Sequence, residues 1–136
     1  MRYGFSLVLL SLAGCSAGAP SGPDPGTFAG AGKDRLCIAG EGDALRGGVI
    51  AYADDGAANC SVTGKLERDP NGWTLTPSGE GACQFRLGIA GDTIGITSVP
   101  ASCSYYCGPG ASLAGKRFTR DPKATPAVDV AGDPLC

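Results

Sequence analysis

The chain contains no histidine. Without an imidazole, catalytic triads of the Ser–His–Asp and Cys–His kinds cannot form, and neither can zinc sites that use histidine ligands. C-x-x-C pairs are absent as well, so we expect no metal site and no cofactor. An excess of positive charge is also missing, because 11 Lys and Arg stand against 13 Asp and Glu. Nucleic-acid-binding domains are usually basic, and we therefore expect no nucleic-acid partner.

Long hydrophobic runs are missing too. The apolar stretch over residues 3–11 is too short to cross a bilayer and is typical of the core of a signal peptide. It follows Arg2, and the sequence Leu-Ala-Gly-Cys ending at Cys15 resembles the lipobox of bacterial lipoproteins. The resemblance implies cleavage before Cys15 and attachment of acyl chains to it, which would anchor the protein in a membrane. An ordinary secretory signal with a chance cysteine is the alternative.

These features divide the chain into three parts. Residues 1–14 are a lipoprotein signal peptide, residues 15–33 are the lipidated cysteine with a flexible tether, and residues 34–136 form a domain. The tether is expected because its Ala, Gly, Ser and Pro residues offer little apolar surface to bury. Ser16, rather than an Asp, follows the lipidated cysteine, which by analogy with enteric bacteria favours the periplasmic side of the outer membrane.

From residue 34 onward the apolar residues alternate with polar ones. This period of two predicts strands over residues 35–39, 48–53, 60–67, 73–76, 83–89 and 93–99, with a last strand over 115–120. The segment Asp69-Pro70-Asn71-Gly72 predicts a turn, and residues 90–93 predict a two-residue hairpin. We expect an all-β fold, a small antiparallel meander curled into a barrel or a sandwich. Trp73, which starts a strand after a tight turn, is expected in the core.

Six cysteines remain after Cys15 is set aside, namely Cys37, Cys60, Cys83, Cys103, Cys107 and Cys136. An even number in an exported protein predicts three disulfides, although the pairing stays open. The equal spacing of Cys37, Cys60 and Cys83 returns the chain to one rim of the meander, where Cys103 and Cys107 should join them. Cys136, the last residue, should pin the tail over residues 123–135. A redox role for Cys103 and Cys107 is the alternative, but their C-x-x-x-C spacing is not that of a redox pair.

The stretch from Cys103 to Gly110 combines two tyrosines with Gly-Pro-Gly. Its C-x-Y-Y-C-G motif resembles one in small proteobacterial lipoproteins that have no established activity. A weaker resemblance links the chain to membrane-bound lysozyme inhibitors, which implies a small lipid-anchored β domain that binds an enzyme. One tyrosine could simply pack over a disulfide. In the alternative interpretation the motif and the basic segment after it form an exposed binding face, made of Tyr105, Tyr106, Lys116, Arg117 and Arg120. Strand alternation would place the two tyrosines on opposite faces.

The expected function is therefore binding, and we expect no enzyme. The chain would be a lipid-anchored module of the cell envelope that binds a protein partner, in one version as an inhibitor of an envelope or host enzyme. A purely structural lipoprotein is the first alternative. The second is a glycan-active enzyme that uses Glu41 and Glu80, each set in a Gly-Glu-Gly turn, as paired carboxylates.

Overall fold

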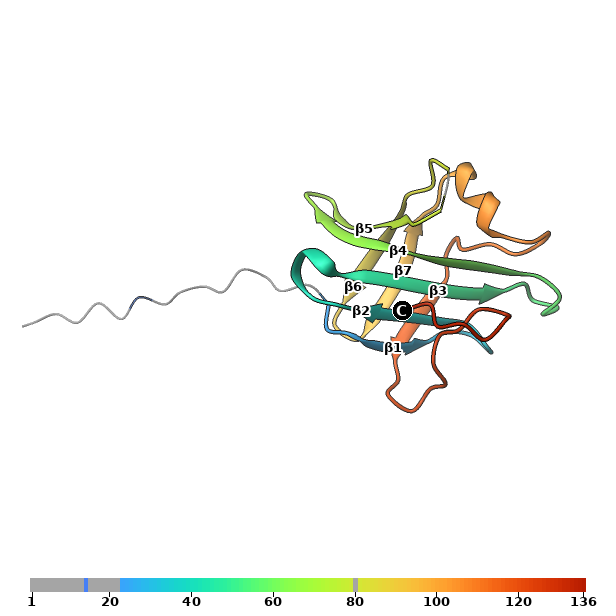
Figure 1. Ribbon diagram of the computed structural model, residues 1–136, viewed down its shortest axis with the longest axis horizontal. Helices are drawn as coiled ribbons and strands as arrows, with labels where there is room; N and C mark the ends of the chain where they lie inside the picture. Colours follow the sequence, from blue (N-terminus) through green and yellow to red (C-terminus); the bar gives the residue numbers. More distant parts are fainter. Residues whose placement is uncertain (1–13, 15–22, 80) are drawn as a thin grey trace, which may run out of the picture.

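The alternating segments form the wall of a closed antiparallel β-barrel, as the computed structural model of residues 14, 23–79 and 81–136 shows (Figure 1). The barrel confirms the prediction of an all-β meander that curls and closes. Within the described residues the strands follow one another in chain order, and β8 pairs with β1 to complete the ring. They are β1 Gly26–Ala29, β2 Arg35–Ala39, β3 Arg46–Tyr52, β4 Asn59–Asp69, β5 Gly72–Pro77, β6 Phe85–Ala90, β7 Thr93–Ser98 and β8 Arg117–Arg120.

Side chains fill the interior of the barrel. Val62 and Leu66 on β4 point inward and are buried, whereas Thr63 and Lys65 between them are exposed. An eight-stranded barrel leaves an interior that inward side chains can just fill. The largest fully buried side chains of this interior cluster are Phe28, Phe85, Phe118, Leu36, Leu75, Ile94 and Leu113. Burial of this apolar surface is the main favourable term in the folding of the barrel.

The first strand corrects the predicted extent of the tether. β1 lies at residues 26–29, inside the segment predicted to be flexible, and Phe28 is only 1 % exposed. β1 closes the barrel by pairing with both β2 and β8. The segment was misjudged because Phe28 is its only large apolar residue, and its burial depends on two strands that are distant in the sequence. Residues 15–22 lie outside the described part of the chain.

Two predicted turns are present. β4 ends at Asp69 and β5 begins at Gly72, while β6 and β7 are joined by Gly91 and Asp92. The carboxylate of Asp69 accepts hydrogen bonds from the Thr74 hydroxyl and the Asn71 backbone N–H, both at 2.8 Å. These bonds, with a contribution from Arg86, lower the pKa of Asp69. The ionised carboxylate therefore orders the β4–β5 hairpin.

The two ends of the barrel differ. The entry end is where β1 begins, and it carries residues 23–25, the 3₁₀-helix η1 (Gly42–Ala44) and the turns at 70–71 and 91–92. The cysteine end carries the turns at 53–58 and 78–84 and the long β7–β8 connection, which contains the 3₁₀-helix η2 (Ala101–Tyr106). No helix in the described ranges is both long enough and apolar enough to cross a membrane.

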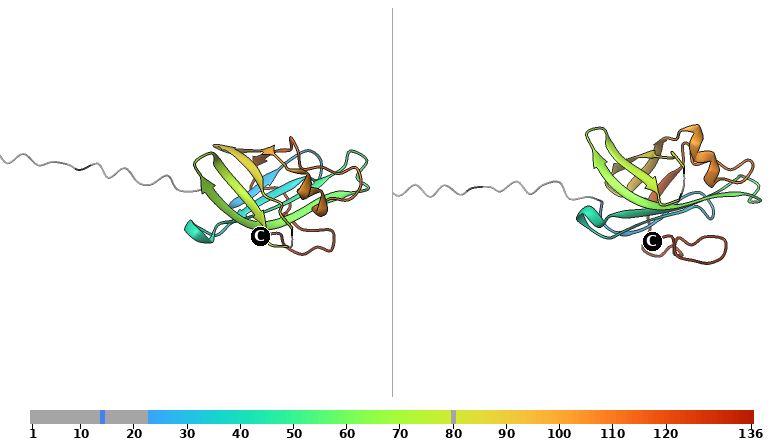
Figure 2. Two further views of the ribbon diagram at one scale, coloured as in Figure 1. Left: turned by 90° about the horizontal axis from the view of Figure 1, so that it is seen from above. Right: turned by 45° about the horizontal axis from the view of Figure 1, so that its top comes forward.

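The tail lies against the outside of the barrel, as Figure 2 shows. A disulfide joins Cys136 to Cys37, which confirms the predicted role of Cys136. The Thr63 hydroxyl donates a 2.6 Å hydrogen bond to the carbonyl of Leu135, and Leu135 and Ala127 bury an apolar patch with Ile50. Gly48 permits this contact, because a Cβ atom there would lie 2.5 Å from that of Leu135. The outer face of β2 and β3 is thus covered by the chain's own C-terminus.

The other two disulfides close the cysteine end. Cys60 on β4 bonds to Cys107 and Cys83 in the β5–β6 connection bonds to Cys103, so one bridge fixes the β7–β8 connection to the barrel wall and the other fixes it to the neighbouring connection. The predicted meeting at one rim holds for these four cysteines. It is wrong for Cys37, which lies in the middle of β2 and faces outward, between the inward Leu36 and Ile38. The equal spacing of Cys37, Cys60 and Cys83 in the sequence does not place them at equal heights in the barrel, because the strands differ in length.

Candidate binding site

Residues 101–106 at the cysteine end form η2 and not a strand, which corrects the expectation that Tyr105 and Tyr106 lie on opposite faces of a sheet. Tyr105 is 74 % exposed, whereas Tyr106 is half-buried and packs against the barrel core. The two rings meet edge to face with their centroids 5.1 Å apart. Tyr106 therefore supports the exposed ring of Tyr105 from the protein side.

Covalent bonds hold η2 in place on both sides. Cys103 within the helix and Cys107 directly after it are bonded to Cys83 and Cys60. The Ser102 hydroxyl donates to the carbonyl of Ala82, and the Gly108 N–H donates to the carbonyl of Asn59. A surface fixed in this way loses little conformational entropy when it binds a partner.

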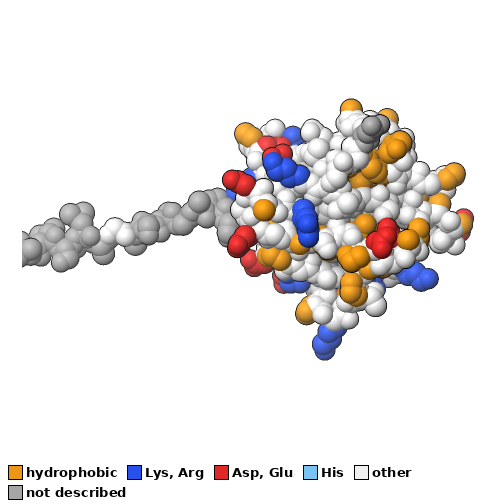
Figure 3. Space-filling view, viewed as in Figure 1, with side chains coloured by type: hydrophobic (Ala, Val, Ile, Leu, Met, Phe, Trp, Pro, Cys, Tyr) orange, Lys and Arg blue, Asp and Glu red, His pale blue; other side chains and the backbone are white. Residues whose placement is uncertain are grey.

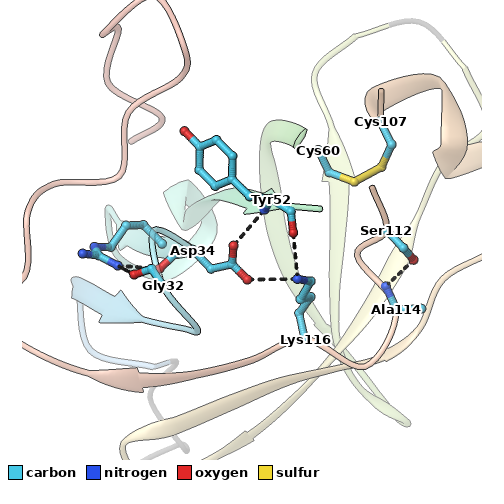
Figure 4. A network of polar contacts seen from close by, with 9 residues as sticks. Gly32, Asp34, Tyr52, Cys60, Cys107, Ser112, Ala114 and Lys116 are labelled. Carbon is cyan, nitrogen blue, oxygen red and sulfur yellow. Dashed lines mark hydrogen bonds and ion pairs between the residues drawn. A yellow bond between two sulfur atoms is a disulfide. The ribbon is translucent and has the colours of Figure 1, made fainter. Parts of the chain in front are cut away.

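Lys116 belongs to an internal network (Figure 4). Its ammonium lies 3.1 Å from the Asp34 carboxylate and donates a second hydrogen bond to the carbonyl of Tyr52. Asp34 is 3 % exposed, and its other carboxylate oxygen accepts the Tyr52 backbone N–H at 2.7 Å. The Lys116 side chain is 24 % exposed. The network ties the β1–β2 turn to the end of β3 and the start of β8.

Arg120 has a structural role at the entry end. Its guanidinium donates to the carbonyls of Asp24 and Pro25 and to the carboxylate of Asp92, at 3.0–3.1 Å. It also lies over the ring of Phe28, 4.5 Å from the centroid, in a cation–π contact. Arg120 thereby fixes the segment that leads into β1.

The five predicted binding residues do not form one face. Tyr105 and Tyr106 lie on η2 at the cysteine end, Arg120 lies at the entry end, and the ammonium of Lys116 is engaged inside the protein. Arg117 is exposed on β8. The basic residues are close in the sequence, which suggested a single patch, but the two ends of β8 lie at opposite ends of the barrel. Of the two tyrosines in the predicted set, Tyr105 is the one that is exposed.

The segments predicted to carry the paired carboxylates of the glycan-active alternative lie far apart in the barrel. Glu41 follows β2 at the entry end, while Gly79 and Gly81 follow β5 at the cysteine end. The odd number of strands between them, β3 to β5, places the two Gly-Glu-Gly turns at opposite ends of an antiparallel barrel. Glu80 itself lies outside the described residues.

A cleft of about 1070 Å³ opens at the entry end. We call it the mouth cleft. One wall consists of residues 23–25, residues 40–43 and Leu45, and the other consists of residues 65–68 with Trp73. Its lining includes the buried side chains of Leu45 and Leu66. Acidic side chains are prominent on this end of the barrel, on the left in Figure 3. The mouths of β-barrels are common positions for small-molecule sites.

Charges of both signs face the mouth cleft. The hydrogen bond and the charge of Glu67 raise the pKa of the Lys65 ammonium, and the charge of Asp43 on the opposite wall adds to the effect. The Lys65–Glu67 ion pair measures 2.7 Å. Glu41 and Asp43 contribute carboxylates to one wall, and Arg68 contributes a guanidinium to the other.

Sequence reasoning missed this site. Trp73 was expected in the core, and it does pack against the core, but it is half-buried and also lines the mouth cleft. Arg68 continues the inward series of Val62 and Leu66 and stands opposite Trp73 across the β4–β5 pair. An arginine at an inward position, paired with a tryptophan at a strand end, was the available signal. Within residues 14, 23–79 and 81–136 no cluster suited to a metal ion is found.

No protein-family model matches the chain, and neither a curated protein nor a solved structure is significantly similar to it. Fold and site therefore define the class. The chain is a small, disulfide-bonded, up-and-down β-barrel with a rigid aromatic projection at one end and a ligand-sized cleft at the other.

Proposed function

We propose that this chain is a lipid-anchored binding module of the bacterial cell envelope, attached through Cys15 and contacting a protein partner through η2. The observation that carries the proposal is the exposure of Tyr105 on a helix that two disulfides hold in place. Tyrosine is among the residues that concentrate binding energy at interfaces. Disulfides persist in oxidising compartments, which agrees with a location outside the cytoplasm.

The position of η2 supports this use of Tyr105. The described chain enters the barrel at the entry end, and η2 lies at the other end. An anchor at residue 15 would then leave η2 pointing away from the membrane surface, accessible to an envelope protein. Inhibition of an envelope or host enzyme is the specific form of binding that the resemblance to lysozyme inhibitors suggests.

The anchor is tested by replacing Cys15. We expect metabolic labelling with a palmitate analogue to mark the wild-type chain, and Cys15→Ala to abolish the label and to move the protein from the membrane to the soluble fraction. Loss of two or more acyl chains removes the hydrophobic anchoring energy. Cys15→Ala leaves the six disulfide cysteines untouched, so barrel folding serves as the control. An unlabelled wild-type chain would show that Cys15 follows an ordinary secretory signal.

The contact surface is tested by photo-cross-linking in cells. A benzophenone amino acid placed at position 105 should give a discrete adduct with one envelope protein under ultraviolet light. The same probe at position 130 is the matched control, because Val130 is similarly exposed, at 72 %, but lies on the tail. We expect Tyr105→Ala to weaken the purified complex by about tenfold or more. Equal adducts from both positions, or none, would favour a purely structural lipoprotein.

If the partner is an enzyme, its activity is measured with the wild-type chain and with Tyr105→Ala. If the partner enzyme loses activity in the presence of the wild-type chain but keeps it in the presence of Tyr105→Ala, the chain is an inhibitor.

A further inference from the structure

We propose that the mouth cleft is a binding site for a neutral oligosaccharide, with one sugar ring lying on Trp73. The cleft is at the opposite end of the barrel from η2, so the inference goes beyond the proposed protein contact and does not depend on it. Its volume of about 1070 Å³ is at the upper limit of the usual range for ligand pockets. A chain of a few sugar rings is an occupant of suitable size.

The walls of the cleft offer complementary hydrogen-bonding groups. Glu41 and Asp43 on one side present carboxylates, which only accept hydrogen bonds when ionised. Arg68 on the other side presents a guanidinium, which only donates. A sugar hydroxyl both donates and accepts, so a ring between the walls can use both sets of groups. Among the described residues, the side chains of Glu41, Asp43 and Arg68 make no hydrogen bond and no close ion pair, so their polar groups are available.

Trp73 supplies the apolar surface that such a ligand needs. It stands between Arg68 and Leu87 in the sheet, and its contact with the core fixes its position. Its half-buried ring is a large, rigid surface with an N–H at one edge. The C–H face of a sugar ring can stack on this surface while its hydroxyls reach the walls. A second hollow of about 440 Å³ shares Trp73 and Arg68 with the cleft and extends it toward Ile89.

The same features argue against other classes of ligand. A fatty acid would need a deep apolar cavity, but the interior behind Leu45 and Leu66 is filled with buried side chains. A phosphate-bearing ligand would meet the carboxylates of Asp24, Glu41 and Asp43. An organic cation would meet the guanidinium of Arg68, which is paired with Trp73 in the sheet. Facing charges of both signs suit a neutral, hydroxyl-rich molecule.

The test uses Trp73 as its own reporter, because it is the single tryptophan of the chain. Full-length protein, in micelles of a detergent that has no sugar headgroup, is titrated with chitotriose and with maltotriose. We expect a saturable change in tryptophan emission with at least one of them and a matching dissociation constant from calorimetry. Spermidine and dodecanoate serve as rival probes, and neither should produce a saturable change.

Two arginine variants decide whether the cleft is responsible. Arg68→Gln should weaken the saccharide roughly tenfold, because a hydrogen bond from a charged donor is lost, while the melting temperature stays unchanged. Arg117→Gln removes an exposed arginine of β8 and should leave the affinity unchanged. The proposal is overturned if neither saccharide binds, if both variants bind alike, or if spermidine or dodecanoate saturates the emission change instead. A failed cross-link at position 105 would leave these results unaffected.

Discussion

Replacing Cys37 and Cys136 together by alanine should lower the free energy of unfolding by about 4 kcal/mol. This bridge spans 99 residues of sequence, and restriction of the unfolded chain grows with the length of the loop that a disulfide closes. The bridge lies on the outer face of β2, where the inward core side chains do not touch it. The barrel should therefore still fold in the variant, and urea unfolding monitored by Trp73 emission measures the difference.

The same variant should release the tail before the barrel unfolds. Leu135 and Ala127 would then be held only by their small apolar contact with Ile50 and by the hydrogen bond from Thr63. Trypsin should cleave after Lys123 many times faster than in the wild type. Val130→Ala is the matched control on the same tail and should change stability by less than about 0.5 kcal/mol. Unchanged stability and unchanged cleavage would show that the noncovalent contacts alone hold the tail.

Replacing Lys116 by methionine should destabilise the barrel by about 3 kcal/mol. The methionine keeps the apolar stem but removes the ammonium, which leaves the buried carboxylate of Asp34 without its counter-charge. An uncompensated buried charge is far more costly than the loss of an exposed ion pair. Arg117→Met, at the next residue and exposed to solvent, should change stability by less than about 0.5 kcal/mol.

A double-mutant cycle separates the pair from its surroundings. Asp34→Asn combined with Lys116→Met removes both charges, so the double variant should be more stable than the sum of the single losses predicts. Additive losses, or equal losses for Lys116→Met and Arg117→Met, would contradict the buried ion pair. Calorimetric melting of the wild type, the two single variants, the double variant and the Arg117→Met control provides the measurement.

The contacts of Lys116, just before β8, and of Arg120, at its end, change how these basic residues are used in binding experiments. Charge reversal of Lys116 and Arg120 would disrupt the Asp34 network and the attachment of residues 24–25, so a loss of binding would report unfolding. Tyr105 on η2 and Arg68 in the mouth cleft are better choices. Tyr105 is largely exposed, and the side chains of Tyr105 and Arg68 make no hydrogen bond to another described residue.

Several features could be predicted from the residues alone. The absence of histidine excludes whole classes of catalytic site before any fold is known. Period-two alternation predicted most of the strands, because each side chain in a strand faces opposite to the next. The even count of cysteines beyond Cys15 predicted full pairing, and the position of Cys136 predicted the pinned tail, which the structure confirms. The lipid anchor at Cys15 stays a prediction.

Other features were decided by tertiary structure, because they depend on segments that meet only when the barrel closes. Phe28 becomes buried when β1 pairs with β2 and β8, so a segment that resembled a tether forms part of the wall. Lys116 becomes internal because closure brings it beside Asp34, far away in the sequence. The antiparallel order of β3 to β5 separates Glu41 from Gly79, and closure of the ring places residues 23–25 at the same mouth as Arg68 and Trp73. Local pattern determined which segments are strands, whereas the circular order of those strands determined which side chains meet.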